Sequence, residues 1–251
     1  MEYGLIGGNL SYSYSKTIHE SFGFYSYELL PLSRKEFPEF MEKKAFKGVN
    51  VTIPYKREVI PYLSDLDDAA GDIGAVNTIV CKNGKLTGYN TDFSGFRYML
   101  KKNGMEAAGK KVLILGTGGA SAAVYAALKA ERAGEILFVS RSGRNGALTY
   151  EEAKSRHTDA ELIVNTTPVG TFPKTDESPL DLAPFTGCLA VADIVYNPAE
   201  TRLTVQARAL NINAATGLDM LIAQAHAAAE HFLERPLPDD LIEKAAARLR
   251  F

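Results

Sequence analysis

The segment Lys110–Ser121 constrains the fold of this chain more than any other. Residues 112–115 form a continuous apolar run, which is typical of a strand buried on both faces. A tight glycine turn follows, and the alanine-rich stretch from Ala120 to Ala133 predicts a helix. This order places backbone N–H groups and a helix N-terminus where they can hold the diphosphate of a dinucleotide. The cofactor-binding residues predicted in the turn are Gly116, Gly118, Gly119, Ala120 and Ser121, the last standing where a third glycine is common.

Composition limits the class of protein. The chain has 251 residues, which suits one large domain or two small ones. Its net charge of −2 gives no field that would attract nucleic acid or an anionic membrane, and no apolar run approaches the roughly 18–20 residues that span a bilayer. The N-terminus lacks the regions of a signal peptide. Cys81 and Cys188 have no partner motif and the four histidines are scattered, so we expect buried thiols, no metal site and a cytoplasmic protein.

Strands and helices alternate over the first ninety residues, which predicts a mostly parallel sheet. Ser33 and Glu36 have the spacing of a capping box at the start of a helix. Asn83-Gly84 is a strong hairpin signal. The predicted strands are Glu2–Gly7, Tyr25–Leu30, Gly48–Ile53, Ala75–Cys81 and Lys85–Tyr89, and the predicted helices are Lys16–Phe24, 33–44 and Tyr55–Leu63.

The remainder of the chain predicts a compact dinucleotide-binding domain followed by two more helices. The connection 142–160 is short for a full crossover helix, so we expect an abbreviated layer there. The fold class is therefore α/β with two domains: a substrate-binding domain of residues 1–92 plus 217–251, and a Rossmann-like domain of residues 93–216. The further predicted strands are Glu135–Ser140, Glu161–Asn165, Leu189–Val195 and Ile212–Ala215, and the further predicted helices are Phe93–Lys102, Gly217–Phe232 and Pro238–Phe251.

The loop after the second strand of this domain predicts which cofactor is bound. NAD enzymes carry Asp or Glu there for the ribose 2′-hydroxyl, about 20 residues beyond the glycine turn. This chain has Ser140, Arg141 and Arg144 and no carboxylate. Two guanidinium groups can hold a 2′-phosphate, which favours NADP(H), although such a pair is also common on a solvated surface.

Another predicted cofactor contact is the strand end Asn165-Thr166-Thr167. It is followed by Pro168, where the chain must leave the sheet because proline cannot continue a central strand. Val195 and Gly217 are further predicted cofactor contacts.

Lys56 and Asp92 are the predicted catalytic residues. Reduction of a ketone by a nicotinamide cofactor requires a proton donor beside the oxygen. Lys56 falls in the first turn of the predicted helix 55–63, where a cation opposes the helix dipole, and this unfavourable placement indicates a function. Asp92 is the natural carboxylate partner. The ordinary alternatives are a solvated lysine and a helix N-cap.

The chain resembles the shikimate dehydrogenase family in eight short blocks, which occur in the family's order and span nearly the whole sequence. The resemblance implies reversible, NADP-dependent reduction of 3-dehydroshikimate to shikimate in aromatic amino-acid (chorismate) biosynthesis. It also implies a first domain completed by the C-terminal helices. The blocks are Ser13–His19, Asn50–Lys56, Gly74–Thr78, Asn90–Asp92, Gly116–Ser121, Asn165–Gly170, Asp193–Pro198 and Gly217–Ala225.

The resemblance also implies which residues hold the substrate. Ser13 and Ser15 match the family's serines for the substrate carboxylate, although Ser/Thr turns are an ordinary alternative, and Tyr196 matches a tyrosine that adds a contact. Hydroxyl-binding groups of the family match Thr52, Asn77 and Gln224, and an amide both donates and accepts, as a hydroxyl requires. Lys56 would give a proton to the oxygen and Asp92 would orient Lys56.

Two other functions are compatible with these blocks. One is a related dehydrogenase that acts on quinate or an aminoshikimate with NAD or NADP, and the other is a non-catalytic sensor of dinucleotide or shikimate. The absence of an acidic residue at 140–144 argues against NAD, and the presence of both Lys56 and Asp92 argues against a pure binder. We expect a monomer or a homodimer with no nucleic-acid or membrane partner.

Overall fold

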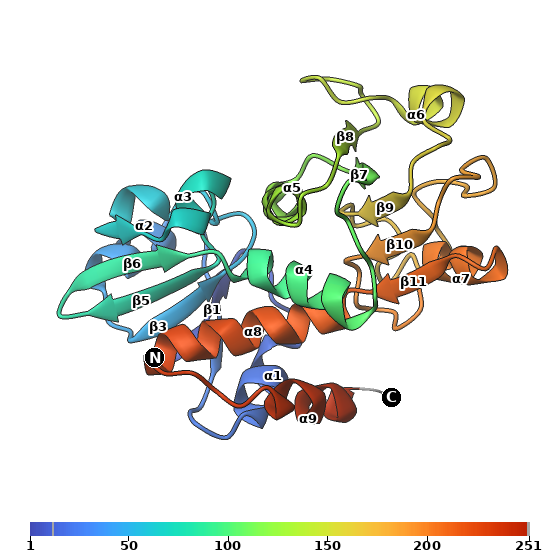
Figure 1. Ribbon diagram of the computed structural model, residues 1–251. Helices are drawn as coiled ribbons and strands as arrows, with labels where there is room; N and C mark the ends of the chain where they lie inside the picture. The colour runs from blue at the N-terminus through green and yellow to red at the C-terminus, as the bar shows by residue number, and fades with distance from the viewer. Residues whose placement is uncertain (12, 250–251) are drawn as a thin grey trace. The chain divides into compact units, whose positions relative to one another are not determined.

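The computed structural model describes residues 1–11 and 13–249, and the chain divides into two compact units. The first unit comprises Met1–Gly95 and Ile222–Phe251, and the second comprises Phe96–Leu221. The predicted boundaries lie a few residues earlier. The first falls in the first turn of α4 (Thr91–Lys102) and the second just before α8 (Leu218–Leu233), whereas the units divide further along these helices. Each unit contains its own sheet (Figure 1).

The sheet of the first unit has six strands in the order β2-β1-β3-β5-β6-β4. β1 is parallel to both β2 and β3, and β4 is parallel to β6, whereas β5 is antiparallel to β3 and β6. The predicted hairpin is confirmed, with Asn83 and Gly84 both at positive φ in the turn between β5 and β6. The strands are β1 (Tyr3–Gly7), β2 (Glu28–Pro31), β3 (Gly48–Val51), β4 (Asp65–Leu66), β5 (Thr78–Lys82) and β6 (Lys85–Tyr89).

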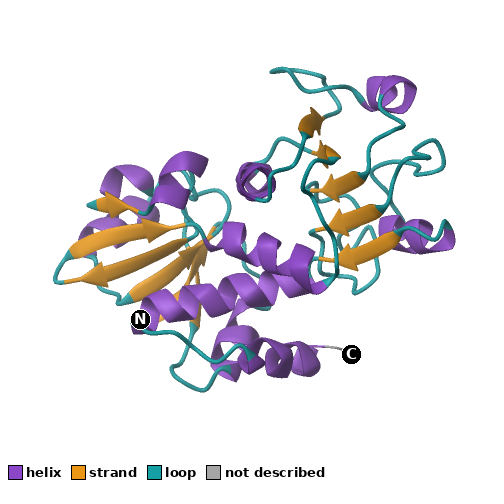
Figure 2. Cartoon of the chain, viewed as in Figure 1, coloured by secondary structure: helices purple, strands orange, loops and turns teal. Residues whose placement is uncertain are grey.

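Helices cover both faces of this sheet (Figure 2). On one face, α2 (Glu36–Lys43) and α3 (Asp68–Ile73) contribute Phe37, Met41 and Ala70 to a buried cluster with strand residues such as Ile79. On the other face, α8 contributes Ala228 and Phe232 to a second cluster with Tyr3, Leu5 and Tyr27. Helix α9 (Asp240–Leu249) contacts α1 (Ser15–Ser21). Helices α8 and α9 therefore complete the first unit from the far end of the sequence.

The sheet of the second unit has five parallel strands in the order β11-β10-β9-β7-β8. Where a further strand would follow β8, only an isolated bridge between Val139 and Leu148 is present before the seven-residue helix α6, which confirms the abbreviated layer. The elements are β7 (Lys111–Leu115), α5 (Gly119–Ala130), β8 (Glu135–Val139), α6 (Tyr150–Arg156), β9 (Leu162–Asn165), β10 (Ala190–Asp193), α7 (Arg202–Ala209) and β11 (Asn213–Thr216).

The predicted helix Tyr55–Leu63 is wrong. This segment forms a series of turns that ends in the short 3-10 helix η1 (Ile60–Tyr62). Pro61 explains the difference, because proline has no N–H and cannot sit in the interior of an α-helix. The Lys56 carbonyl instead accepts from the Val76 N–H at 2.7 Å. Sequence reasoning also missed β4, α3 and α7.

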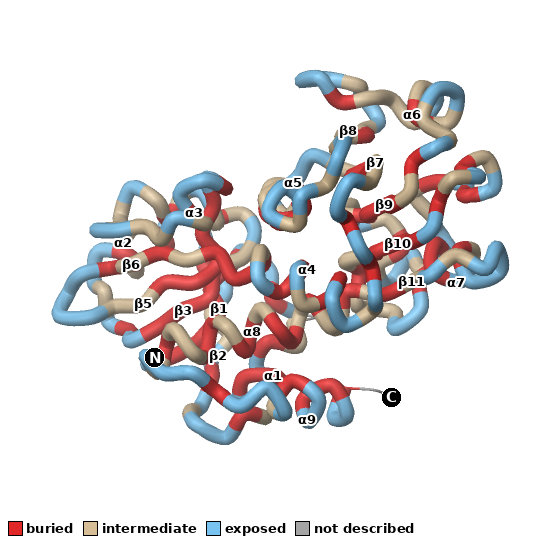
Figure 3. The backbone as a smooth tube through the Cα atoms, viewed as in Figure 1, coloured by how far each residue is buried: buried red, intermediate tan, exposed pale blue. Residues whose placement is uncertain are grey.

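The buried segments follow the strands of each sheet and the inner faces of its helices (Figure 3). Residues 112–115 are all buried, as the apolar run predicted. No helix within residues 1–11 and 13–249 is both long and apolar enough to cross a bilayer.

Candidate active site

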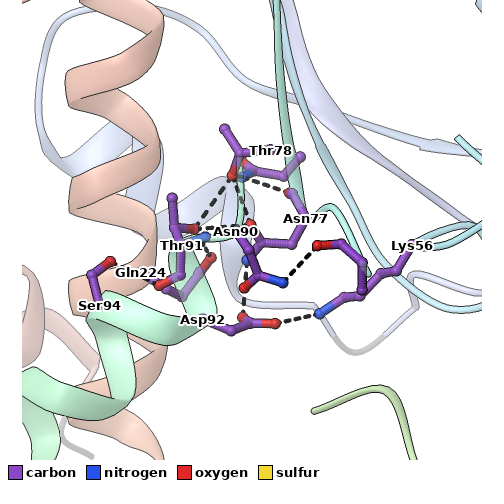
Figure 4. Close-up of polar contacts among 10 residues, drawn as sticks. Lys56, Asn77, Thr78, Asn90, Thr91, Asp92, Ser94 and Gln224 are labelled. Carbon is purple, nitrogen blue, oxygen red and sulfur yellow. Dashed lines mark hydrogen bonds and ion pairs between the residues drawn. The ribbon is translucent and has the colours of Figure 1, made fainter. Parts of the chain in front are cut away.

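Lys56 and Asp92 contact each other in the first unit. The Lys56 Nζ lies 2.6 Å from Asp92 Oδ2, and only 18% and 12% of the two side chains are exposed. Lys56 stands in the turns after β3, and Asp92 in the first turn of α4 (Figure 4). The residues are 36 positions apart, so the tertiary fold brings them together. The two predicted catalytic residues form a partly buried ion pair.

Asn77 holds the Asp92 carboxylate at its other oxygen. The Asn77 Nδ2 donates to Asp92 Oδ1 at 2.9 Å, and the Asn77 Oδ1 accepts from the Thr91 N–H at 2.8 Å. Asp92 thus shares its oxygens between an ammonium and an amide, which fixes the plane of the carboxylate. Both oxygens of Asp92 make tertiary contacts and the residue lies inside α4, so the alternative of a helix N-cap does not describe its bonding.

Three buried residues that sequence reasoning did not single out support Asn77. Thr78 Oγ1 donates to Asn77 Oδ1 at 3.0 Å, and Asn50 Nδ2 donates to Thr78 Oγ1 at 3.0 Å. The Tyr27 hydroxyl donates to Asn50 Oδ1 at 2.6 Å, and burial raises the pKa of Tyr27 well above its ordinary value, so the phenol keeps its proton. The available signal was a polar Asn50 inside the buried strand Gly48–Val51.

The structure changes one argument for Lys56. Because residues 55–59 form turns, Lys56 does not lie at the N-terminus of an α-helix, and the dipole argument for its function does not apply. Its position depends instead on the 2.7 Å hydrogen bond between its carbonyl and Val76, the neighbour of Asn77. The lysine and the amide are therefore positioned by the same short segment.

The other predicted substrate residues of the first unit lie at three places. Gln224 on α8 accepts from Thr91 Oγ1 at 3.3 Å, which joins it to the Asn77 network. Ser13 Oγ donates to Ser15 Oγ at 3.0 Å and accepts from the Ser15 N–H at 3.2 Å, which is a local turn. Thr52 is half-buried directly after β3. Within the described residues, no hydrogen bond connects either serine or Thr52 with the Lys56–Asp92 pair.

This arrangement can support proton transfer. Lys56 presents an ammonium donor that a carboxylate holds in a partly desolvated place, where electrostatic interactions are stronger than in water. Asn77 and Gln224 add groups that both donate and accept. Chemically, the site fits a polar, hydroxylated ligand with an oxygen that gains or loses a proton.

The glycine turn of the second unit leaves open space at the start of α5. Gly116 has φ +102°, and a Cβ built there would lie 3.0 Å from the side chains of Thr166 and Thr167. A Cβ on Gly118 or Gly119 would meet no atom within 4 Å. The backbone at the start of this 12-residue helix is therefore uncrowded around Gly118 and Gly119, and the free N–H groups of a helix start favour an anion such as a diphosphate. Ser121, in place of a third glycine, closes the turn through a 2.6 Å bond to the Gly118 carbonyl.

The loop after β8 carries the predicted discriminator. Ser140 Oγ accepts from the Gly143 N–H at 3.2 Å, and Arg141 and Arg144 are exposed. Residues 140–147 contain no carboxylate. Because β8 lies beside β7, this cationic loop and the glycine turn follow neighbouring strands at the same edge of the sheet. The residues present fit a dinucleotide that carries an additional phosphate.

Two further loops at this edge are tied to their neighbours. Thr166 Oγ1 donates to the Leu115 carbonyl at 2.7 Å, and Asn165 Oδ1 accepts from the Thr167 hydroxyl at 2.7 Å. The Gly217 N–H donates to the Val195 carbonyl at 2.8 Å. The chain leaves the sheet after Asn165, as Pro168 predicted.

Tyr196 adjoins Val195 and belongs to the second unit. Among the described residues, no cluster of three or more His, Cys, Asp or Glu is arranged to hold a metal ion.

The parallel sheet with its glycine turn, together with an ammonium–carboxylate pair in an α/β unit of its own, defines the class of nicotinamide-dependent oxidoreductases with two α/β domains. Residues 5–79 match the family model described as "Shikimate dehydrogenase substrate binding domain". The chain belongs to the shikimate dehydrogenase family.

Individual relatives agree with this assignment. A shikimate dehydrogenase (NADP(+)) of Clostridium beijerinckii is 36% identical over 96% of this chain and 95% of its own. A chorismate mutase/shikimate 5-dehydrogenase fusion protein from Clostridium acetobutylicum has a similar structure, with a TM-score of 0.91, 33% identity and coverage of 98% and 96% of the two chains. Shikimate 5-dehydrogenase from Thermus thermophilus, solved with NADP(H) and shikimate, has a TM-score of 0.87 at 32% identity and coverage of 99% and 100%.

Proposed function

We propose that this chain catalyses the reversible, NADPH-dependent reduction of 3-dehydroshikimate to shikimate in aromatic amino-acid biosynthesis. The observation that carries the proposal is the 2.6 Å contact between Lys56 and Asp92, supported by Asn77, in a chain of the shikimate dehydrogenase family. A protein that only binds shikimate or a dinucleotide does not require a proton donor held in this way.

In this proposal the first unit holds the substrate. Lys56 donates a proton to the ketone oxygen during reduction and accepts it during oxidation. Asp92 fixes the position of the ammonium and accepts from a neighbouring substrate hydroxyl. Asn77, Thr52 and Gln224 bind ring hydroxyls. Ser13, Ser15 and Tyr196 bind the substrate carboxylate.

The second unit holds the cofactor, which supplies the hydride when bound. Gly116, Gly118 and Gly119, with Ala120 and Ser121, surround the diphosphate, whose charge the start of α5 favours. Arg141 and Arg144 bind the 2′-phosphate beside Ser140. The remaining proposed cofactor contacts are Asn165, Thr166, Thr167, Val195 and Gly217.

The test is a matrix of initial rates with purified protein. We expect oxidation of NADPH at 340 nm with 3-dehydroshikimate and a much lower rate with NADH. We expect little activity with 3-dehydroquinate, the ketone that corresponds to quinate. Faster turnover with dehydroquinate or with NADH would contradict the proposal and indicate a quinate-type dehydrogenase. No turnover of either ketone would indicate a protein that only binds these ligands.

Arg141→Ala tests the choice of cofactor. Loss of a charge-assisted contact to the 2′-phosphate should weaken NADPH binding on the order of tenfold or more, while NADH binding changes little. The dissociation constants can be measured through the fluorescence of the two reduced cofactors. Lys129→Ala, which removes an exposed cation near the end of α5, is the matched control. An equal loss for both cofactors would mean that Arg141 only supports its loop.

We also propose that the protein works in the cytoplasm as a monomer or a homodimer. Light scattering coupled to gel filtration measures the oligomeric state directly, and an assembly larger than a dimer would contradict the proposal.

A further inference from the structure

Asp193 is a fully buried carboxylate at the carboxyl edge of the second sheet. Its register partners are Asn165 on β9 and Thr216 on β11, and Asn165 is in turn the partner of Leu115 on β7. Leu115 directly precedes the glycine turn. Because neighbouring strands are about 4.8 Å apart, the Asp193 backbone lies about 10 Å along this row from the end of β7.

Both oxygens of the Asp193 carboxylate accept hydrogen bonds. Oδ1 accepts from the Asn165 amide at 2.9 Å and from the Val195 N–H at 3.1 Å, and Oδ2 accepts from the Thr201 hydroxyl at 2.7 Å. Thr201 caps α7, so the carboxylate ties the ends of the 194–201 loop to each other and to β9. A Cβ on Gly217 would lie 2.0 Å from the Ile194 carbonyl, which places the next strand end directly against the same loop.

These contacts do not require a negative charge. All three donors are neutral, and no ion pair to Asp193 occurs within residues 1–11 and 13–249. An asparagine could accept from Asn165 and Val195 through its oxygen and donate to the Thr201 hydroxyl through its nitrogen. Burial raises the pKa of Asp193 to about 6, so the carboxylate is mostly ionised above neutral pH although that ionisation is unfavourable. The ionised carboxylate therefore carries a buried negative charge that no cation within residues 1–11 and 13–249 pairs with, and its electrostatic field is free to favour a cation bound nearby.

The cofactor has one part whose charge changes in the reaction. The oxidised nicotinamide ring carries a positive charge and the reduced ring is neutral. In a parallel dinucleotide-binding sheet, the two halves of the ligand lie over the carboxyl edge on either side of the first strand. The arginine-bearing loop follows β8 on one side of β7, and β9 and β10 lie on the other. Asp193 therefore stands in the half opposite the proposed 2′-phosphate site.

We propose that Asp193 determines how strongly the protein prefers the oxidised over the reduced cofactor: its buried carboxylate stabilises the cationic nicotinamide half of NADP+ through the low-dielectric edge of the sheet. This inference rests on the proposed use of NADP(H) by the second unit. Asp193 acts through the electrostatic field of its carboxylate and through the 194–201 loop that it orders. It is therefore a positioning residue. A purely structural carboxylate would affect both forms of the cofactor alike.

The test compares the affinities of NADP+ and NADPH by isothermal titration calorimetry at pH 8. In Asp193→Asn, which keeps size and hydrogen bonds, we expect NADP+ to bind on the order of tenfold more weakly while NADPH changes by less than about twofold. The matched control is Asp176→Asn, which removes the same charge from an exposed site of the same unit. An unchanged ratio of the two affinities in Asp193→Asn would overturn the inference. Failure of the wild-type protein to bind either cofactor would instead overturn the proposed function.

A second measurement needs no variant. The carboxyl carbon of Asp193, observed by NMR in protein labelled at aspartate, should titrate at a lower pH with NADP+ bound than with NADPH bound. The variant spectrum serves only to assign the signal. Identical titration in the two complexes would show that the carboxylate does not sense the charge of the ring, and would also overturn the inference.

Discussion

At the scale of single residues, the site depends on how one carboxylate divides its two oxygens. Asp92 gives Oδ2 to Lys56 and Oδ1 to Asn77, whose own oxygen is held by Thr91 and Thr78. A lysine side chain has several rotatable bonds, so an unheld ammonium would spend little time at one point. The amide and the ion pair together restrict the ammonium to the geometry that a proton transfer requires.

Replacement of Lys56 tests its place in the proposed reaction. In Lys56→Ala we expect kcat to fall about 10²–10⁴-fold, because the donor for the developing alkoxide is lost, while the dissociation constant of shikimate changes only a few-fold. Steady-state kinetics and calorimetry measure the two quantities separately. Lys56→Arg should also be slow because a guanidinium retains its proton, whereas Lys35→Ala, at an exposed lysine, should behave as wild type. Normal turnover in Lys56→Ala would remove this residue from the mechanism.

The pairing of Lys56 with Asp92 could be proposed from the sequence because each residue stands in a block that resembles the family. The reason first given for Lys56, a helix N-terminus, did not hold, although Pro61 in the same segment already argued against that helix. Asn50 and Thr78 could not be identified as supports, since their function depends on side-chain contacts between β3 and β5. The block Asp193–Pro198 does not by itself indicate a function for Asp193, because the environment of this carboxylate arises from the register of three strands.

At the scale of elements, close packing of α8 on β3 explains one glycine. A Cβ on Gly48 would lie 2.3–2.9 Å from three ring atoms of Phe232, so strand and helix approach too closely for any side chain. Phe232 is buried with Tyr3, Leu5 and Tyr27 and has little room to move. The fit between these two elements therefore depends on the absence of a methyl group.

Gly48→Ala should lower the free energy of unfolding by about 1–3 kcal/mol, the usual effect of overpacking. Gly71→Ala is the matched control, because a Cβ there meets nothing within 4 Å and the residue lies in α3. In that helix the change should raise stability by about 0.5–1 kcal/mol. Urea unfolding of the three proteins measures both effects. Equal stability of Gly48→Ala and wild type would mean that the Phe232 ring can move aside at little cost in free energy.

Periodicity and turn chemistry account for which elements were predictable. The buried strand at 112–115 and the hairpin at Asn83-Gly84 have local signals that need no tertiary context. Helix α7 was missed although Thr201 and Thr204 form a reciprocal capping box at its start, because that box uses threonine in place of Glu or Gln. β4 has only two residues and exists because β6 lies beside it.

At the scale of the whole molecule, the buried Asp193 should be visible in the pH dependence of stability. Burial raises its pKa from 3.8 to about 6, so the folded protein binds a proton that the unfolded chain has already released between about pH 4 and pH 6. The stabilising contribution of this proton is fully present below about pH 4 and is lost as the pH rises through about 6. The loss amounts to about 3 kcal/mol for a shift of this size.

Asp193→Asn should not show this loss. The free energy of unfolding of the variant relative to wild type should therefore increase by about 2 kcal/mol between about pH 4.5 and pH 7.5, since the rest of the loss falls below pH 4.5, and this holds whatever the offset at the lower pH. Urea titrations at a series of pH values give this difference, in which the other titrating groups cancel. A difference that is flat or decreases with pH would show that Asp193 is not protonated more readily in the folded state.

The first unit is assembled from two distant parts of the chain. Its aromatic cluster requires Ala228 and Phe232 as well as Tyr3, Leu5 and Tyr27, whereas the second unit is one uninterrupted segment. During synthesis on a ribosome, Tyr3 and Leu5 emerge long before Ala228 and Phe232, and the segment Phe96–Leu221 between them is available to fold earlier. The core of the first unit therefore cannot be completed until Ala228 and Phe232 have been synthesised, when the whole of the second unit is already available for folding.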